Sequence, residues 1–440
     1  MPQDDRCCGS ASRSGRGDAL ARGRLSSAQQ FQRPEAVMVS ANPTVHENPM
    51  LNAIQGINVI DCDSHVTEPP DLWTSRAPAT LRDRMPQLRK VDGEHFWFVD
   101  GDVPLGPVGL SVVESSGDKV LGILGVHDFE RLDAAAYEVP ARLELMERLG
   151  LYAQIVYPNI SGFASANFLN IPDQELRNAC VTTYNDAMGE WQTTSGGRLF
   201  PQALLPFWDL DATLAEMRRT VEEYGTRGYT ICDTPEKFDL PDYGTSHWDP
   251  FFELAQDLDV VLNFHIGSGG AKGAPSPFVS SPWESMGPER KLAIGAANIY
   301  IDNARMISNL LYSDVLERFP KLKFVSVESG IGWIPFLLEA CEYQWDEMVP
   351  TEVKHHELRP TEKFRRNIWA CFWFEDFGPR KVIEQIGVKN VLFETDFPHP
   401  TCLYPRSQEH IANVLGDLDS EVRTAVLERN ASELYRIETG

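Results

Sequence analysis

Eight short runs of apolar and β-branched residues recur along most of this chain, and amphipathic stretches separate them. The runs lie at 57–63, 152–158, 199–207, 228–233, 260–265, 323–328, 367–372 and 390–396. They are continuous rather than alternating polar with apolar, as expected of parallel strands that are covered on both faces. In one separating stretch, Leu214, Met217, Val221 and Tyr224 fall on a single helical face. The sequence thus predicts an α/β fold, a (β/α)8 TIM barrel with insertions.

An open doubly wound sheet is the competing arrangement. It has less support, because no G-x-G-x-x-G motif follows the first run and no Walker lysine motif is present. Two long segments interrupt the pattern. Residues 66–140 contain a predicted hairpin around His95–Val99, and residues 266–293 are rich in Gly, Ser and Pro. Both follow strand ends on the face where barrel active sites lie, so we expect an inserted lid at 66–140 and a substrate wall at 266–293.

Composition narrows the range of partners. The chain has 40 Lys+Arg against 64 Asp+Glu, a net charge of −24 at pH 7, which argues against nucleic acids and anionic membranes as partners. No run of about 18 apolar residues predicts a transmembrane helix. The 8 cysteines form no C-x-x-C pair, and several lie in apolar runs. That pattern predicts buried free thiols in a reducing compartment, the cytoplasm.

The first 50 residues differ in kind from the remainder. Residues 1–50 are rich in Ser, Gly, Ala and Arg and contain no apolar run that could anchor a core. They predict a disordered tail ahead of one catalytic domain at 56–437. A secretory signal is not expected, because the tail has no apolar h-region.

Ionisable residues end four of the apolar runs. The first run ends in Asp61, Asp63 and His65, with Glu68 just beyond; the fifth ends in His265, the sixth in Glu328, and the eighth in Asp396 followed by His399. In a barrel these ends converge on one mouth. Each residue alone also fits an ordinary turn, cap or rim position. Together they would repel one another or recruit a cation, and a divalent metal is the simplest resolution.

The same residues resemble the amidohydrolase-related superfamily, in particular its branch of aminocarboxymuconate semialdehyde decarboxylase and other small-acid decarboxylases. The motifs that carry the resemblance are VIDCDSHVTEPPDLW at 59–73, His265, ERFPKLKFVSVESG at 317–330, ETDFPHP at 394–400 and NASELYRI near the end. The resemblance implies a metal held by Asp63, His65, His265 and Asp396. The family's H-x-H pair reads Asp63-x-His65 here, and Glu328 replaces its sixth-strand His.

The resemblance implies a metal-dependent hydrolase or non-oxidative decarboxylase that acts on a small carboxylated organic molecule. One or two ions of Zn, Mn or Fe suit these oxygen-rich ligands. Asp396 would be the acid/base, and Glu328 a ligand or proton shuttle. His399 and Arg76 are candidates to orient the substrate, although Arg76 also fits a surface ion pair. Trp248 would line the pocket or pack a helix on the barrel.

Two further functions stay open. With Asp61 and Glu68 included, the ligands suffice for two adjacent ions, as in dinuclear Fe or Mn hydroxylases that use O₂ and that occur among relatives. The changes to Asp63 and Glu328 also fit a barrel that has lost activity and serves as a non-catalytic partner subunit. The resemblance further implies a homodimer, with the predicted helix at 333–345 as a candidate contact.

Overall fold

The structure, a computed structural model, describes residues 37–39, 49–268 and 283–439. The chain divides into Met1–Ala36 and a second unit, Val37–Gly440, which contains all the helices and strands named below. Most of the predicted tail at 1–50 lies outside the described residues. Within it, β1 pairs with β6, and a 3-10 helix begins at Pro49. In the described part of the chain, no helix has the length and apolar character needed to cross a membrane.

The strands and helices alternate along the chain as the sequence pattern predicts. The strands are β1 (Val37–Val39), β2 (Ile60–His65), β3 (Gln87–Val91), β4 (Glu94–Val99), β5 (Val103–Pro107), β6 (Lys119–Leu121), β7 (Ala153–Tyr157), β8 (Leu199–Pro201), β9 (Gly228–Thr230), β10 (Val261–His265), β11 (Lys323–Val327), β12 (Ile368–Phe372) and β13 (Val391–Phe393). The helices are α1 (Val139–Leu149), α2 (Gln174–Thr194), α3 (Leu210–Tyr224), α4 (Asp249–Asp257), α5 (Pro288–Ile299), α6 (Asn303–Tyr312), α7 (Val315–Arg318), α8 (Ile334–Met348), α9 (Pro360–Asn367), α10 (Phe377–Lys381), α11 (Ile383–Ile386), α12 (Ser407–Leu415), α13 (Ser420–Thr424) and α14 (Asn430–Tyr435).

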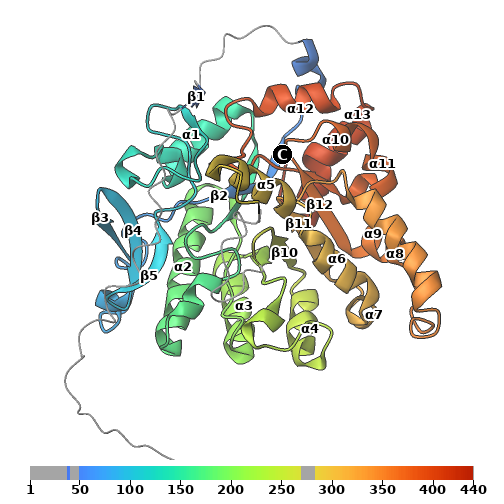
Figure 1. Cartoon of the computed structure of the whole chain (residues 1–440), viewed down its shortest axis with the longest axis horizontal. Helices are drawn as coiled ribbons and strands as arrows, with labels where there is room; N and C mark the ends of the chain where they lie inside the picture. Colours follow the sequence, from blue (N-terminus) through green and yellow to red (C-terminus); the bar gives the residue numbers. More distant parts are fainter. Residues whose placement is uncertain (1–36, 40–48, 269–282, 440) are drawn as a thin grey trace, which may run out of the picture. The chain divides into compact units, whose positions relative to one another are not determined.

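Each of the eight apolar runs contains one parallel strand, so the predicted strands are confirmed. They form a three-stranded sheet in the order β2-β7-β8 and a five-stranded sheet in the order β13-β12-β11-β10-β9. Single bridges join the outer strands of the two sheets, one from Ser64 to Phe397 and one from Ala203 to Tyr229. Figure 1 shows β10, β11 and β12 in the middle of this unit, with helices such as α3, α4 and α6 around them.

The side chains of these strands divide between two cores. Ile60, Cys62, Ile155 and Val325 join a compact core built from residues of both parallel sheets. Neighbouring positions such as Leu262 face a larger core that also contains apolar residues of the helices. Both faces of the strands are therefore covered, which explains why the runs are continuous in the sequence.

Local signals in the sequence set the helix ends. The Asp209 carboxylate accepts a hydrogen bond from the Ala212 amide at the start of α3, and Gly225 ends this helix with a positive φ of 63°. The helix expected from the spacing of Leu214 and Met217 is therefore present. The helix predicted at 333–345 is also present, as α8.

The insertion after β2 contains the predicted hairpin. β4 and β5 pair antiparallel, and β3 extends them to three strands. The six cysteines in the described residues are buried and free, as predicted; Cys7 and Cys8 lie outside that part of the chain.

We expect Tyr435→Phe to lower the free energy of unfolding by about 1–3 kcal/mol, because the buried Asn263 side chain then loses its hydrogen-bond donor. The Tyr435 hydroxyl donates to Asn263 Oδ1 at 2.7 Å and connects α14 to β10. Urea denaturation of both proteins measures the difference. Tyr152→Phe is the matched control, because its exposed hydroxyl donates to the Glu438 carbonyl, and we expect a change below about 0.5 kcal/mol. Equal effects of the two substitutions would contradict the assigned role of Tyr435.

Candidate metal centre

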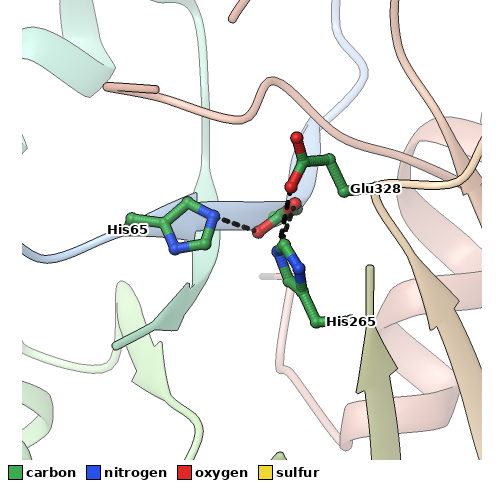
Figure 2. Close-up of side chains that lie close together, drawn as sticks. His65, His265 and Glu328 are labelled. Atoms are coloured by element: carbon green, nitrogen blue, oxygen red, sulfur yellow. Dashed lines mark ion pairs between the residues drawn. The ribbon is translucent and has the colours of Figure 1, made fainter. Parts of the chain in front are cut away.

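Ionisable side chains from four parallel strands meet at one buried point. Asp63, His65, His265 and Glu328 offer ligand atoms that all lie within 4.8 Å of one another. A second group, His65, Glu328, Asp396 and His399, meets the same condition and shares two members with the first. Figure 2 shows His65, His265 and Glu328 directed toward a common centre. The predicted convergence of strand ends therefore occurs for six of the candidate residues.

The spacing of the donor atoms suits a common ion. Nε2 of His65 lies 3.2 Å from Oδ1 of Asp63 and 3.4 Å from Oδ1 of Asp396. Nε2 of His265 lies 3.3 Å from Oδ2 of Asp63 and 3.4 Å from Oε2 of Glu328. Ligands bound to one ion at about 2.0–2.2 Å lie roughly 3–3.5 Å apart, so the observed distances fit.

The backbone holds both imidazoles in the orientation that a ligand needs. Nδ1 of His65 lies 3.1 Å from the Pro158 carbonyl, and Nδ1 of His265 lies 3.0 Å from the Ile266 carbonyl. A proton on Nδ1 satisfies each carbonyl and leaves Nε2 with a free lone pair toward the centre. This is the usual arrangement of histidine ligands, in which the second nitrogen donates to an outer partner.

Several buried atoms at the centre have no hydrogen-bond partner in the part of the chain that the structure describes. They are both carboxylate oxygens of Asp63, Oδ1 of Asp396 and the Nε2 atoms of His65, His265 and His399. Buried polar atoms are rarely left unpaired in folded proteins, and each such atom costs about 1–3 kcal/mol. A divalent cation would pair with several of them at once, so the residues present fit a metal.

The charged groups at the centre shift one another's pKa values strongly. Burial lowers the pKa of His65, but the Asp63 and Asp396 carboxylates outweigh it and raise this pKa to about 9. Burial and the His65 imidazole lower the pKa of His399 to about 4. Burial raises the pKa of Glu328 well above its ordinary value, and the Asp396 and Asp63 carboxylates add to that rise. The centre therefore concentrates negative charge that a cation would neutralise.

Two of the candidate residues have a left-handed backbone. Glu328 has a φ of 52° and Asp396 a φ of 61°, although neither is a glycine. Such conformations cost of the order of 1–3 kcal/mol and concentrate at functional sites. Here each turns the chain at a strand end, and hydrogen bonds hold the turns. The Glu328 amide donates to Oε2 of Glu394, and the Asp396 amide donates to the Asp63 carbonyl.

Asp61 lies outside the group of ligand atoms, contrary to its prediction as a ligand. Its carboxylate accepts hydrogen bonds from the Thr395 amide at 2.7 Å, the Thr395 hydroxyl at 2.6 Å and the Gln154 side chain at 2.8 Å. The physical reason is a register shift between Asp61 and Ser64 where β2 pairs with β7, which breaks the simple alternation of side chains. Burial raises the pKa of Asp61 to about 7.

A buried arginine extends the hydrogen bonds of Asp61, Thr395 and Gln154, which together form an outer network around the centre. Arg142 is fully buried, and its Nη1 donates to Oε1 of Gln154 at 3.1 Å. Its Nη2 donates to the backbone carbonyl of His65 at 2.6 Å, so the guanidinium also fixes a candidate ligand. Burial lowers the pKa of Arg142 to about 10, which still leaves it charged at neutral pH beside Asp61.

Glu68 also lies outside the ligand group, and the structure corrects its predicted role. Its carboxylate accepts hydrogen bonds from the amides of Asn159, Ile160 and Ser161, the turn that follows β7. The carboxylate is therefore occupied by backbone donors rather than directed to the centre. This turn leads to Phe163, whose ring stacks on His265 with the ring centroids 3.9 Å apart.

Arg76 and Trp248 are not part of the site. Arg76 donates through Nη2 to Oε2 of Glu190 at 2.5 Å, the surface ion pair that the sequence left open. Trp248 is buried, donates to the Pro241 carbonyl at 2.7 Å and packs against Tyr243. It fills the core, which is the other interpretation that the sequence allowed. Neither residue lines the cavity described next.

A cavity of about 810 Å³ opens beside the centre, and Glu328 and His399 lie in its wall. The insertion at 66–140 contributes Leu105, Leu110 and Ile123, and the segment at 266–293 contributes Ile266 and Leu292 among others. Residues 269–282 of that second segment lie outside the described residues. Both segments therefore border the space in front of the candidate ligands.

Sequence reasoning missed several residues of the site. They are Glu394, Gln154, Arg142 and Phe163. None of them ends one of the apolar runs: Gln154 lies within β7, Arg142 in α1 and Phe163 in the turn after β7. A signal exists only for Glu394, an acidic residue two positions before Asp396 within an apolar strand. Burial raises its pKa well above the ordinary value, and the Asp63 carboxylate adds to this.

Comparison with known proteins places this geometry in a family. The Amidohydrolase family model matches residues 60–437. This chain belongs to the amidohydrolase family. Among its relatives is a gamma-resorcylate decarboxylase of Rhizobium radiobacter, 23% identical over 315 residues, which cover 68% of this chain and 86% of the relative. The chain is therefore an enzyme of the hydrolase and carboxy-lyase type.

Solved structures of other proteins share the fold of this chain. An amidohydrolase from Mycobacterium avium subsp. paratuberculosis superposes with a TM-score of 0.64 at 19% identity, over 88% of this chain and 99% of that one. A dihydroxybenzoic acid decarboxylase from a Polaromonas species, solved with manganese and 2-nitroresorcinol, has a TM-score of 0.53 at 17% identity, over 87% of this chain and 98% of that one. At these identities the likeness shows the fold, a mixed α/β architecture.

We expect His265→Ala and Asp396→Asn each to weaken metal binding strongly. Loss of an outer partner lowers metal affinity by about 10- to 100-fold, and loss of a direct ligand should lower it further. Each substitution removes a donor atom from the centre. Metal content after dialysis, measured by mass spectrometry, reports the loss. His247→Ala, an exposed histidine outside the cluster, is the control and should retain full occupancy. Full occupancy in both site variants would contradict the ligand assignment.

Asp61→Asn tests whether Asp61 acts from the outer network. The variant presents an amide group to the Thr395 and Gln154 donors, so we expect metal affinity to fall by about 10- to 100-fold without abolishing binding. Titration of the apoprotein with Mn²⁺ measures the affinity. Complete loss of binding, as for His265→Ala, would show that Asp61 is a direct ligand after all.

Proposed function

We propose that this chain is a metal-dependent decarboxylase of an aromatic carboxylic acid. The observation that carries the proposal is the set of donor atoms of Asp63, His65, His265 and Asp396 that have no hydrogen-bond partner among the described residues, beside a cavity whose wall includes Glu328 and His399. Support also comes from the relatives, several of which are named decarboxylases, and from the manganese bound in the dihydroxybenzoic acid decarboxylase. A bound divalent ion would supply positive charge that orients a substrate oxygen and stabilises negative charge as it develops.

The chain's own residues account for the movement of the proton. Decarboxylation requires a proton to reach the carbon that bears the carboxylate before the carbon–carbon bond breaks and CO₂ leaves. Asp396 is placed to pass this proton on after accepting it from His399, because its Oδ1 lies 3.1 Å from Nδ1 of His399. His399 lies in the cavity wall, and its Nε2 has no partner among the described residues, so it is placed to hold the substrate or relay the proton.

The scaffold of this site is a closed barrel with one catalytic domain at 56–437. Support comes from the two bridges that link the parallel sheets, and from the inner core that draws side chains from both. Residues 66–140 serve as the lid and wall of the site, because Leu105, Leu110 and Ile123 border the cavity.

A second candidate function follows from the overlap of the two ligand groups. Because His65 and Glu328 belong to both, the centre has donors for two neighbouring ions. A pair of Fe or Mn ions bound by carboxylates and histidines would suit an O₂-dependent hydroxylase on the same scaffold. The carboxylate of Glu328 favours this candidate, because carboxylate oxygens suit hard ions such as Mn²⁺.

We expect the metal-loaded protein to release CO₂ from 2,6-dihydroxybenzoate without consuming O₂, and to lose this activity on chelation and regain it with Mn²⁺. With Mn²⁺ at a saturating concentration, Asp396→Asn should still lower kcat by about 10²–10⁴, the usual contribution of a positioned acid. A CO₂ assay run beside an oxygen electrode measures both gases, with His247→Ala as the control. O₂ uptake that depends on substrate would favour the hydroxylase, and neither gas changing with any aromatic acid tested would contradict both.

A further inference from the structure

We infer that the cavity beside the metal centre prefers a substrate with a long apolar body, joined to a single anionic end, over an unsubstituted dihydroxybenzoate. This inference names the substrate class of the same site and so rests on the proposed function. The size and the lining of the cavity support it, because decarboxylation at the centre needs neither a large cavity nor an apolar one.

The cavity is larger than a single substituted ring needs. Its volume of about 810 Å³ lies toward the upper end of the roughly 300–1,000 Å³ that enclose drug-sized ligands. The ligand donors occupy only one part of its wall, where Glu328 and His399 lie. A benzoate bound there would leave most of the space to water against apolar side chains, which is unfavourable.

Helix α5 forms an apolar wall of this cavity. The residues of α5 that line the cavity with apolar side chains are Leu292, Ala293, Ala296 and Ile299. They are one, three and three positions apart, so they lie on one face of the helix. In Figure 1, α5 lies over the central strands. Leu105, Ile123 and Leu169 line the cavity from other segments. Small residues on the α5 face leave room. Apolar residues outnumber polar ones such as Asn167, Asn170 and Thr401 in the described lining, which favours hydrocarbon over polar groups.

The charges of the lining differ between the metal end of the cavity and the remainder of its wall. Among the described residues that line the cavity, Glu289, Glu328 and His399 are ionisable, and neither Lys nor Arg is present. A carboxylate placed away from the centre would therefore meet no cationic side chain of this lining and would face Glu289. Within the described lining, an anionic group is favourable only at the metal end, so we expect the remainder of the substrate to be neutral.

The probes are 5-alkylresorcinols with methyl, propyl, pentyl and heptyl chains, which correspond to the products of the matching 2,6-dihydroxy-4-alkylbenzoates. They bind whether or not the protein turns over, so their affinity tests the cavity alone. Burial of one methylene contributes about 0.8 kcal/mol, so we expect affinity to rise about three- to fourfold per methylene, and on the order of a hundredfold from methyl to pentyl. Calorimetry on the Mn²⁺-loaded protein measures the affinity.

Two matched variants localise the effect. Ala296→Trp fills the cavity from α5, and we expect it to weaken the pentyl and heptyl probes at least tenfold while the methyl probe changes less than about threefold. Ala297→Trp introduces the same side chain at an exposed position of α5 outside the lining and should leave all affinities unchanged. Ala293→Phe serves as a second cavity variant if Ala296→Trp does not fold.

A probe of equal length that ends in a carboxylate tests the charge argument. We expect it to bind at least tenfold more weakly than the pentyl probe. Affinities independent of chain length, equal behaviour of Ala296→Trp and Ala297→Trp, or tight binding of the carboxylate-ended probe would each overturn the inference.

Turnover separates the inference from the proposed function. Release of CO₂ from 2,6-dihydroxybenzoate, with no gain in kcat/KM from a 4-alkyl chain, would overturn the inference and leave the decarboxylase intact. Chain-dependent binding with no CO₂ from any of the alkylbenzoates would overturn the decarboxylase and support the cavity assignment.

Discussion

The burial of several carboxylates beside three imidazoles is the constraint on which this structure depends. Asp61, Asp63, Glu394 and Asp396 are fully buried, and Glu328 is nearly so. Removing one such charge from water costs several kcal/mol even after relaxation, so the fold needs compensation close by. Arg142 and backbone donors compensate the outer carboxylates, whereas the inner ones face unpaired histidine nitrogens. A cation at that point would relieve both kinds of deficit at once.

The outer network and the centre have separate tasks. Asp61, Gln154 and Arg142 form a hydrogen-bonded chain from β2 to α1, and its arginine ends on the carbonyl of His65. Glu68 binds the turn that leads to Phe163, which stacks on His265. Both arrangements orient a histidine without contacting its Nε2 atom. Arg142 holds the backbone of His65, and the Phe163 ring holds the imidazole of His265. Outer partners of this kind set the orientation of ligands and thereby tune the affinity for metal.

Chemistry and selectivity are located on different parts of the chain. The ligand donors come from the ends of parallel strands, which a packed core holds rigidly. The cavity wall comes from the insertion after β2, the turn after β7 and helix α5. Loops and short helices can change without disturbing the strands, so the substrate can change while the centre is kept. The large apolar cavity of this amidohydrolase family member is consistent with that division.

The sequence by itself determined the eight parallel strands, the helices between them, and the residues Asp63, His65, His265, Glu328 and Asp396 at the strand ends. It could do so because burial on both faces leaves continuous apolar runs, in which a polar residue stands out. Only the tertiary structure decided the roles of Asp61, Glu68, Arg76 and Trp248, and it revealed Arg142 and Glu394. The reason is that a one-residue register shift, a turn or a surface partner redirects a side chain, and no periodicity in the sequence records it.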